Sequence, residues 1–360
     1  MLRRVLSHAA SHFDRAVSAA MFSKRRVSQE SARADALDHA ARIRVLEEIR
    51  ALYDRPEHFS ASDSFFRAPE PIDPRMAAVR ATIAGIAGGA VVDAFWESAF
   101  APYCEEIAGS YLAHGRNRTA AARLFLHAGQ PRPVALLLHG YRCGQWALEE
   151  RFWPISWLFE RGLDVALAVL PFHAVRARRG GRPVFPSSDP RVTIEGFRQS
   201  VHDLRALIRH LRDRGAPTVG VLGMSLGGYT SSLLATVEPG LGFAVPMIPL
   251  ASIADFARTG GRLVGTGEEQ RLQYEAIEAA YRVVSPLARP PAIERERVLV
   301  VGAAADRITP IEHARRLATH FDAPLEVFPG GHLLQFGRGE AFRSVGRLLG
   351  RLGLLVPRRP

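Results

Sequence analysis

The sequence predicts an α/β protein in which a mostly parallel sheet is covered by helices on both faces. The first observation is that short apolar runs alternate with longer segments of helical periodicity from about residue 120 to the C-terminus. The second is that each run is apolar throughout, as is typical of parallel strands buried on both faces. The third is the length of 360 residues, with 47% hydrophobic and 23% charged residues, which suits one large α/β domain plus an extension.

The expected strands are apolar runs that end in turn signals such as His-Gly, Pro-Phe or Gly-Gly. They occupy residues 120–127, 133–141, 163–172, 218–225, 242–250, 297–306 and 323–332. The expected helices have apolar residues three and four positions apart, and several end at a glycine. They occupy residues 145–162, 194–215, 226–240, 310–321 and 339–353. Residues 76–130 have a mixed pattern, in which 120–127 is the expected strand.

The chain divides into an extension and a main domain. Residues 1–75 are charged, alanine-rich and helical in pattern, and closely spaced prolines end this region. Residues 76–360 form the α/β domain. Within it, residues 251–296 interrupt the alternation and contain a helical pattern at 267–284. An insertion at this point lies near the carboxyl ends of the strands, where ligands bind, so we expect a small helical cap or lid.

Composition excludes several classes of protein. The net charge is +11, and Lys24 is the only lysine, so the positive charge is almost all arginine, which suggests a GC-rich bacterial genome. The arginines are spread along the chain without a nucleic-acid-reading motif, so we expect no nucleic-acid partner. Cys104 and Cys143 form neither a disulfide framework nor a metal-ligand cluster, which favours free thiols in a reducing cytoplasm and no metal.

No segment has the features of a membrane span. Charged and histidine residues interrupt the apolar residues of positions 1–21, which favours an amphipathic surface helix over a signal peptide. The apolar run 81–96 is too short for a span and contains Asp93. We expect a cytoplasmic protein, and the amphipathic start of the chain leaves peripheral contact with a membrane as an alternative. The oligomeric state is open.

The motif GMSLGG at residues 223–228 predicts a nucleophile at Ser225. It follows an apolar strand and precedes a helix, and a turn this tight lifts the serine hydroxyl above the edge of the sheet. The helix N-terminus then points its unpaired N–H groups at the reacting centre. The alternative is that Ser225 is a helix cap without chemistry. The position between strand and helix favours the nucleophile.

A serine nucleophile needs a base, and the base needs an acid to orient it. His332 lies in the loop after the last strand, within FPGGH, and is the expected base, although a structural loop histidine is the alternative. Asp306 ends the preceding strand and is the expected acid. Its alternative role is that of a helix N-cap, for which Thr309 is a second candidate. The order Ser225, Asp306, His332 matches one known triad order.

The oxyanion of such a reaction needs two hydrogen-bond donors. The amide of Leu226 directly follows the nucleophile. A second amide, that of Tyr141, follows the strand end at His139-Gly140 in LLLHGYRCG. His139 itself is expected to pack or hydrogen-bond locally, and the side chains of Tyr141 and Arg142 are expected to line the pocket.

The segments LLLHGYRCG, LPFHAVRARRG, GMSLGGYTSSLLA, GAAADRITP and FPGGH resemble the α/β-hydrolase superfamily over residues 95–350. LPFHAVRARRG, followed by RQSVHDLRALIRHL, is similar to the group of abhydrolase domain-containing protein 18. The resemblance implies the α/β-hydrolase fold, a serine hydrolase acting on esters or amides, and no cofactor.

Residues 171–183 form a basic loop on the ligand side of the expected sheet. His173 and Arg176 are candidates for binding an anionic group of the substrate, together with Arg142. The alternative is a solvated loop without a role in binding.

The sequence is compatible with three functions. The first is a serine esterase or lipase that cleaves a small-molecule, lipid or anionic carboxylic ester through an acyl-enzyme on Ser225. The second is an acyltransferase that uses the same nucleophile. The third is a non-catalytic binding protein on a hydrolase fold, against which the complete set Ser225, Asp306 and His332 argues.

Overall fold

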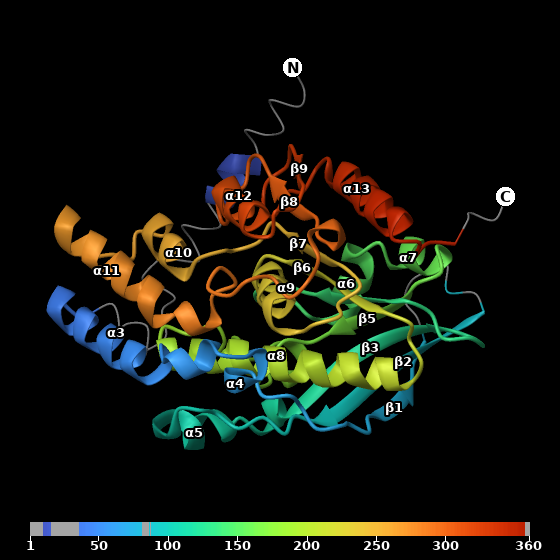
Figure 1. Ribbon diagram of the computed structural model, residues 1–360, viewed down its shortest axis with the longest axis horizontal. Coiled ribbons are helices and arrows are strands. Elements are labelled where there is room, and N and C mark those ends of the chain that lie inside the picture. Colours follow the sequence, from blue (N-terminus) through green and yellow to red (C-terminus); the bar gives the residue numbers. More distant parts are fainter. Residues whose placement is uncertain (1–9, 16–35, 81–85, 87, 357–360) are drawn as a thin grey trace.

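A nine-stranded sheet with helices on both faces forms the centre of the protein (Figure 1). The computed structural model describes residues 10–15, 36–80, 86 and 88–356. The strands are β1 (Arg75–Ala78), β2 (Gly89–Glu97), β3 (Thr119–His127), β4 (Val134–Leu138), β5 (Asp164–Ala168), β6 (Val219–Met224), β7 (Ala244–Met247), β8 (Val300–Ala303) and β9 (Leu325–Phe328).

The strand order is β1-β2-β3-β5-β4-β6-β7-β8-β9. The six strands from β5 to β9 in this order are parallel, whereas β1, β2 and β3 pair antiparallel with their neighbours. The prediction of a mostly parallel sheet is therefore confirmed. The sequence did not predict β1 and β2, because β1 is short and half-buried and the apolar run of β2 is interrupted by Asp93. That carboxylate is compensated by Arg123 of β3 at 2.6 Å.

Each buried strand contributes side chains to two separate apolar layers. Leu136 and Leu138 of β4 belong to the core on one face of the sheet, and Leu137 between them belongs to the core on the other. Because side chains alternate along a strand, a strand covered on both faces must be apolar at every position. This is the physical reason for the uniform apolar runs in the sequence.

Helices from different parts of the chain cover the two faces. Side chains of α5 (Glu105–Leu112), α8 (Pro190–Asp213), α9 (Leu226–Val237) and α12 (Ile311–His320) join the first core, and those of α6 (Trp146–Phe152), α7 (Ile155–Glu160) and α13 (Arg338–Arg351) join the second. The single helix expected at 145–162 is two helices, because Pro154 lies between α6 and α7 and has no N–H for a continuous helix.

Short 3₁₀ segments connect the main elements. They are η2 (Pro56–Phe59), η3 (Gly115–Arg118), η4 (Ala174–Arg176), η5 (Arg282–Val284) and η6 (Arg295–Arg297).

The described part of the N-terminal extension is helical, as predicted, and docks on the main domain. It contains a helix at residues 10–15, α3 (His39–Tyr53) and α4 (Ser62–Phe65). The hydroxyl of Tyr53 donates to the buried Glu195 of α8 at 2.9 Å. The expected surface helix covers residues 1–21, of which only 10–15 belong to the described residues.

The insertion at 251–296 contains α10 (Ile253–Thr259) and α11 (Gly267–Ala280), so its helical character is as expected. Figure 1 shows α11 beside α3 of the extension, and Arg42 of α3 donates to the carbonyl of Arg262 at 2.8 Å. Asp255 of α10 pairs with Arg316 of α12. The insertion thus packs against the extension and α12, and its role as a lid stays a prediction.

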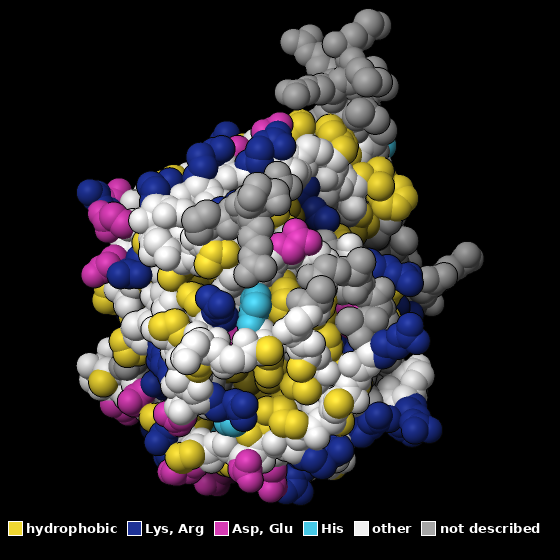
Figure 2. Space-filling model, turned by 90° about the vertical axis from the view of Figure 1, so that its right-hand side faces the viewer, with side chains coloured by type: hydrophobic (Ala, Val, Ile, Leu, Met, Phe, Trp, Pro, Cys, Tyr) yellow, Lys and Arg dark blue, Asp and Glu magenta, His cyan; other side chains and the backbone are white. Residues whose placement is uncertain are grey.

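The face of the molecule in Figure 2 has arginine side chains scattered among acidic and apolar ones rather than gathered in one basic patch. Within the described residues, no helix combines the length and the hydrophobicity that a bilayer span requires. Location in the cytoplasm and contact with a membrane surface stay predictions.

Candidate active site

Ser225 stands on a strained turn between β6 and α9. Its backbone angles are φ 55° and ψ −111°, a conformation that residues other than glycine rarely adopt. The turn is held by the Ser225 amide, which donates to the carbonyl of Met247 on β7 at 3.0 Å. Such strain persists only where the surrounding structure enforces it, so the turn is an enforced feature of the fold.

The two glycines that flank Ser225 in the motif are required by close backbone packing. A Cβ at Gly223 would lie 2.0 Å from the carbonyl oxygen of Gly227. A Cβ at Gly227 would lie 2.2 Å from the carbonyl oxygen of Leu138 at the end of β4. Only glycine allows α9 to start this close to the sheet, so the G-x-S-x-G pattern follows from sterics at this turn.

His332 and Ser225 meet at the carboxyl ends of the strands. His332 follows β9, is buried, and places its Nε2 3.0 Å from the Ser225 Oγ. This distance allows the imidazole to take the hydroxyl proton. The structure therefore brings together the residues that the sequence proposed as nucleophile and base.

Asp306 completes a chain of three side chains. Its Oδ2 lies 2.8 Å from His332 Nδ1, and its Oδ1 accepts the amides of Ile308 and Thr309, each at 2.8 Å. The alternative that Asp306 or Thr309 caps a helix is wrong, because the residue before α12 is Pro310. The sequence did not foresee that the Thr309 hydroxyl lies 3.0 Å from His332 Nδ1.

The charges around His332 favour its protonated form. Burial lowers the pKa of His332, but the charge and hydrogen bond of Asp306, with the charge of Asp14 added, raise it above its ordinary value overall. A base with a raised pKa accepts the serine proton more readily. The carboxylate of Asp306 also stabilises the imidazolium that results.

The loop after β4 lies beside the nucleophile. A Cβ built on Gly140 would be 3.6 Å from the Cβ of Ser225, so the Tyr141 amide follows a residue in contact with the nucleophile. Leu226 is the first residue of α9, where a helix leaves its N–H groups without backbone acceptors. Both predicted donors thus belong to segments that adjoin Ser225.

His139 and Glu149 hold this loop. The amide of Leu170 donates to His139 Nε2 at 3.0 Å, so the Nδ1–H of His139 donates to the carbonyl of Gly140 at 2.8 Å. Burial lowers the pKa of His139 to about 4, which keeps the ring neutral. Glu149 accepts the Gly144 amide at 2.8 Å. The local hydrogen bonding expected of His139 is confirmed, whereas the sequence gave no indication of Glu149.

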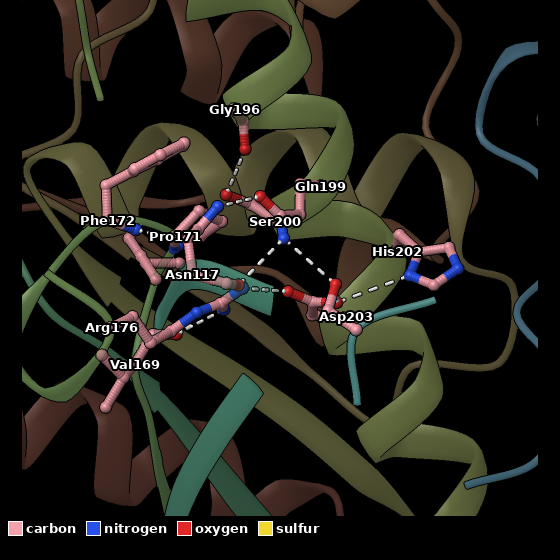
Figure 3. Close-up of polar contacts among 12 residues, drawn as sticks. Asn117, Val169, Pro171, Phe172, Arg176, Gly196, Gln199, Ser200, His202 and Asp203 are labelled. Atoms are coloured by element: carbon pink, nitrogen blue, oxygen red, sulfur yellow. Dashed lines mark hydrogen bonds and ion pairs between the residues drawn. The ribbon is translucent and has the colours of Figure 1, made fainter. Parts of the chain in front are cut away.

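Arg176 and His173, two of the expected substrate-binding residues, are buried within the protein, and their contact with a substrate stays a prediction. The guanidinium of Arg176 is buried and donates to Asp203 at 2.7 Å, to the Val169 carbonyl at 3.0 Å and to the Asn117 carbonyl at 2.9 Å. Figure 3 shows this side chain pointing toward Asp203 of α8. His173 is fully buried, and Nδ1 contacts the Pro171 carbonyl at 2.8 Å. The sequence could not reveal that a basic loop turns these side chains inward.

Arg142 is the remaining candidate for contact with the substrate. It is exposed, and its φ of 63° lies in the left-handed region. It lies two residues after Gly140, on the loop next to Ser225. Its position therefore agrees with the expected pocket lining, and its contact with a substrate stays a prediction.

Known proteins similar to this chain fall into two groups. No family model matches the chain. The uncharacterized proteins Rv2627c and MT2702 of Mycobacterium tuberculosis, strains H37Rv and CDC 1551, are each 32% identical over 273 residues, which is 72% of this chain and 64% of the relative. The match therefore spans less than two thirds of the length of these relatives.

Two solved esterases have a similar structure. The acetyl xylan esterase from Paenibacillus sp. R4 is 14% identical with a TM-score of 0.56, over 85% of this chain and 98% of the esterase. Acetyl xylan esterase 1 from Thermoanaerobacterium sp. JW/SL YS485 is 15% identical with a TM-score of 0.52, over 84% of this chain and 98% of the esterase. At this identity the likeness concerns the fold, and the chain has the α/β-hydrolase fold.

Proposed function

We propose that this protein is a serine hydrolase that cleaves carboxylic esters through an acyl-enzyme on Ser225. The observation that carries the proposal is the continuous chain from Ser225 Oγ to His332 Nε2 at 3.0 Å and from His332 Nδ1 to Asp306 at 2.8 Å. A binding protein does not need a strained serine joined to a buried histidine and carboxylate. The acetyl xylan esterases of similar fold support ester substrates.

The first half of the reaction acylates the serine. Ser225 Oγ attacks the ester carbonyl while His332 Nε2 takes its proton, and the carbonyl oxygen becomes an oxyanion. The amides of Tyr141 and Leu226 donate to this oxyanion, and Asp306 stabilises the imidazolium. The imidazolium then gives its proton to the leaving alkoxide, and the alcohol departs.

The second half returns the free enzyme. A water molecule gives a proton to His332 and attacks the acyl carbon, and the second tetrahedral intermediate collapses to release the acid. Ser225 Oγ recovers its proton from the imidazolium. Each oxyanion-hole donor stabilises such a transition state by about 3 kcal/mol.

The residues around Ser225 and His332 favour esters with an apolar acyl group. Leu333 and Leu334, which follow the base, are 43% and 44% exposed, and they suit an ester with an apolar acyl group. Arg142 is the exposed candidate for contact with an anionic group, since Arg176 and His173 are buried. Membership of the group of abhydrolase domain-containing protein 18 rests on the sequence motifs alone.

The test is labelling with a fluorophosphonate probe and hydrolysis of p-nitrophenyl acetate, with Ser225→Ala as the variant. We expect labelling of the wild type that disappears in Ser225→Ala, and a loss of ester turnover by at least about 10⁴-fold. The matched control is Ser110→Ala, an exposed serine on α5, which should retain both. A folded wild type that neither reacts with the probe nor hydrolyses the ester would refute the proposal.

The same assay separates hydrolysis from acyl transfer. Addition of a small alcohol to the reaction offers the acyl-enzyme a second acceptor. A hydrolase continues to form mainly the free acid, whereas an acyltransferase forms the new ester and releases little acid. The ratio of acid to ester, measured by chromatography, decides between the two.

A further inference from the structure

The N-terminal helix at residues 10–15 lies against the loop that carries the base. Asp14 of this helix is fully buried, and its Oδ2 accepts the amide of His332 at 2.6 Å. Its Oδ1 accepts the amide of Leu333 at 3.1 Å. A carboxylate that accepts two successive amides fixes the backbone of a loop, because two acceptor atoms fix both position and orientation.

The same helix also contacts the loop that carries the acid. The amide of Arg307, directly after Asp306, lies 3.4 Å from Asp14 Oδ2. The Nε of Arg307 donates to the hydroxyl of Ser11 at 2.8 Å. One short helix therefore joins the loops of the acid and the base, which are adjacent in space but belong to different strands.

The fit of this helix depends on Gly331. A Cβ at Gly331 would lie 2.6 Å from Asp14 Oδ2 and 3.2 Å from the Cβ of Ala10. A side chain at position 331 would displace the Asp14 carboxylate from its place and crowd Ala10. The glycine before the base thus makes room for Asp14, which indicates a built contact rather than an incidental one.

Two carboxylates act on the imidazole of His332. Asp306 bonds to its Nδ1, and Asp14 accepts the backbone amide of His332. Arg307 touches Asp14 only through its backbone amide, and its guanidinium donates to the hydroxyl of Ser11. Asp14 is thus a second buried carboxylate near the ring besides Asp306. Its charge acts in the same direction as that of Asp306, toward the imidazolium.

We propose that Asp14 is a positioning residue of the active centre: its carboxylate fixes the loop of His332 and stabilises the charged imidazole during the reaction. The N-terminal helix is then part of the active site although it lies outside the hydrolase domain in sequence. The proposal rests on the proposed ester hydrolysis for its kinetic consequence. The contact between Asp14 and the loop of His332 follows from the geometry of Asp14 and Gly331, whatever reaction the site performs.

The main variant is Asp14→Asn, which keeps the size of the side chain and removes its charge. We expect kcat to fall by roughly 10- to 100-fold with little change in KM, because the base is displaced rather than the substrate. The rise of kcat/KM with pH should shift to lower pH, since His332 loses a charge that raises its pKa. Asp14→Glu, which keeps the charge, should restore the pH profile better than it restores kcat.

The matched control is Glu48→Gln, which removes one exposed carboxylate from α3 of the same extension. It should leave both kcat and the pH profile unchanged. Circular dichroism of each variant checks that the fold is retained. If Asp14→Asn behaves like Glu48→Gln in kcat and in the pH profile, the proposal is overturned.

A second readout does not depend on activity. The pKa of the His332 imidazole, followed by NMR titration of the whole protein, should fall in Asp14→Asn and remain unchanged in Glu48→Gln. An inactive wild type in which this shift still occurs would refute the proposed hydrolysis but retain the contact of Asp14 with the base. An unchanged His332 pKa in Asp14→Asn would refute the role of Asp14 alone.

Discussion

Replacement of Arg176 by methionine separates a structural role of this side chain from a role in substrate binding. The side chains of Arg176 and Asp203 are only 1% and 5% exposed, and their charged atoms are 2.7 Å apart. Burial raises the pKa of Asp203, but the nearby Arg176 guanidinium brings it below its ordinary value. Methionine fills similar volume but leaves the carboxylate without its counter-charge.

The expected loss of stability follows from these contacts. Removal of one partner of a buried ion pair destabilises a protein by about 3–5 kcal/mol. The carbonyls of Val169 and Asn117 also lose a donor, which adds about 1 kcal/mol for each. The total of about 5–7 kcal/mol is a large part of the 5–15 kcal/mol by which typical proteins are stable.

The assay is urea unfolding followed by tryptophan fluorescence, and the free energy of unfolding is compared through the midpoint. Arg178→Met is the matched control, because Arg178 lies on the same loop but is exposed, and it should change stability by less than about 0.5 kcal/mol. The milder Arg176→Lys keeps a positive charge near Asp203 and serves if Arg176→Met does not fold. An Arg176→Met variant that is as stable as the wild type and has a raised KM for anionic esters would refute the structural role.

Two further predictions concern the turn and the buried histidines. Gly227→Ala should abolish ester turnover and destabilise the protein by at least about 1–3 kcal/mol, since the new Cβ would lie 2.2 Å from the carbonyl oxygen of Leu138. A variant with the stability and the ester turnover of the wild type would contradict this steric argument. Acidification from pH 7 to 5 should lower the free energy of unfolding. Burial lowers the pKa of His139 to about 4 and that of His173 to about 3, whereas a histidine in the unfolded chain has its ordinary pKa near 6.5. At pH 5 the unfolded chain binds protons at these two rings that the folded protein does not bind. Each of the two rings therefore lowers the stability of the folded protein by about 2 kcal/mol at pH 5. His173→Phe should reduce this dependence of the urea midpoint on pH, whereas the exposed His12→Gln should not; equal slopes in both variants would contradict the assignment.

The order of strands and helices could be predicted because it depends on local pattern. A strand covered on both faces is apolar at each position, and a helix on a sheet is apolar at every third or fourth, so both leave a mark in sequence. The strands β1 and β2, at one end of the sheet, leave a weaker mark. They are partly exposed, and Asp93 of β2 is tolerated only because Arg123 pairs with it from a neighbouring strand.

The sequence by itself determined the positions of Ser225, Asp306 and His332 relative to strand ends, because parallel strands bring their carboxyl ends to one edge of the sheet. Only the tertiary structure decided which other polar residues belong to that edge. Arg176 lies in a loop that looks solvated but turns inward to Asp203, whereas Asp14 lies outside the domain pattern but reaches the base. These contacts depend on the direction of a side chain and on the docking of segments that are distant in sequence. Neither produces a periodic pattern of apolar residues, so neither can be recognised from the sequence.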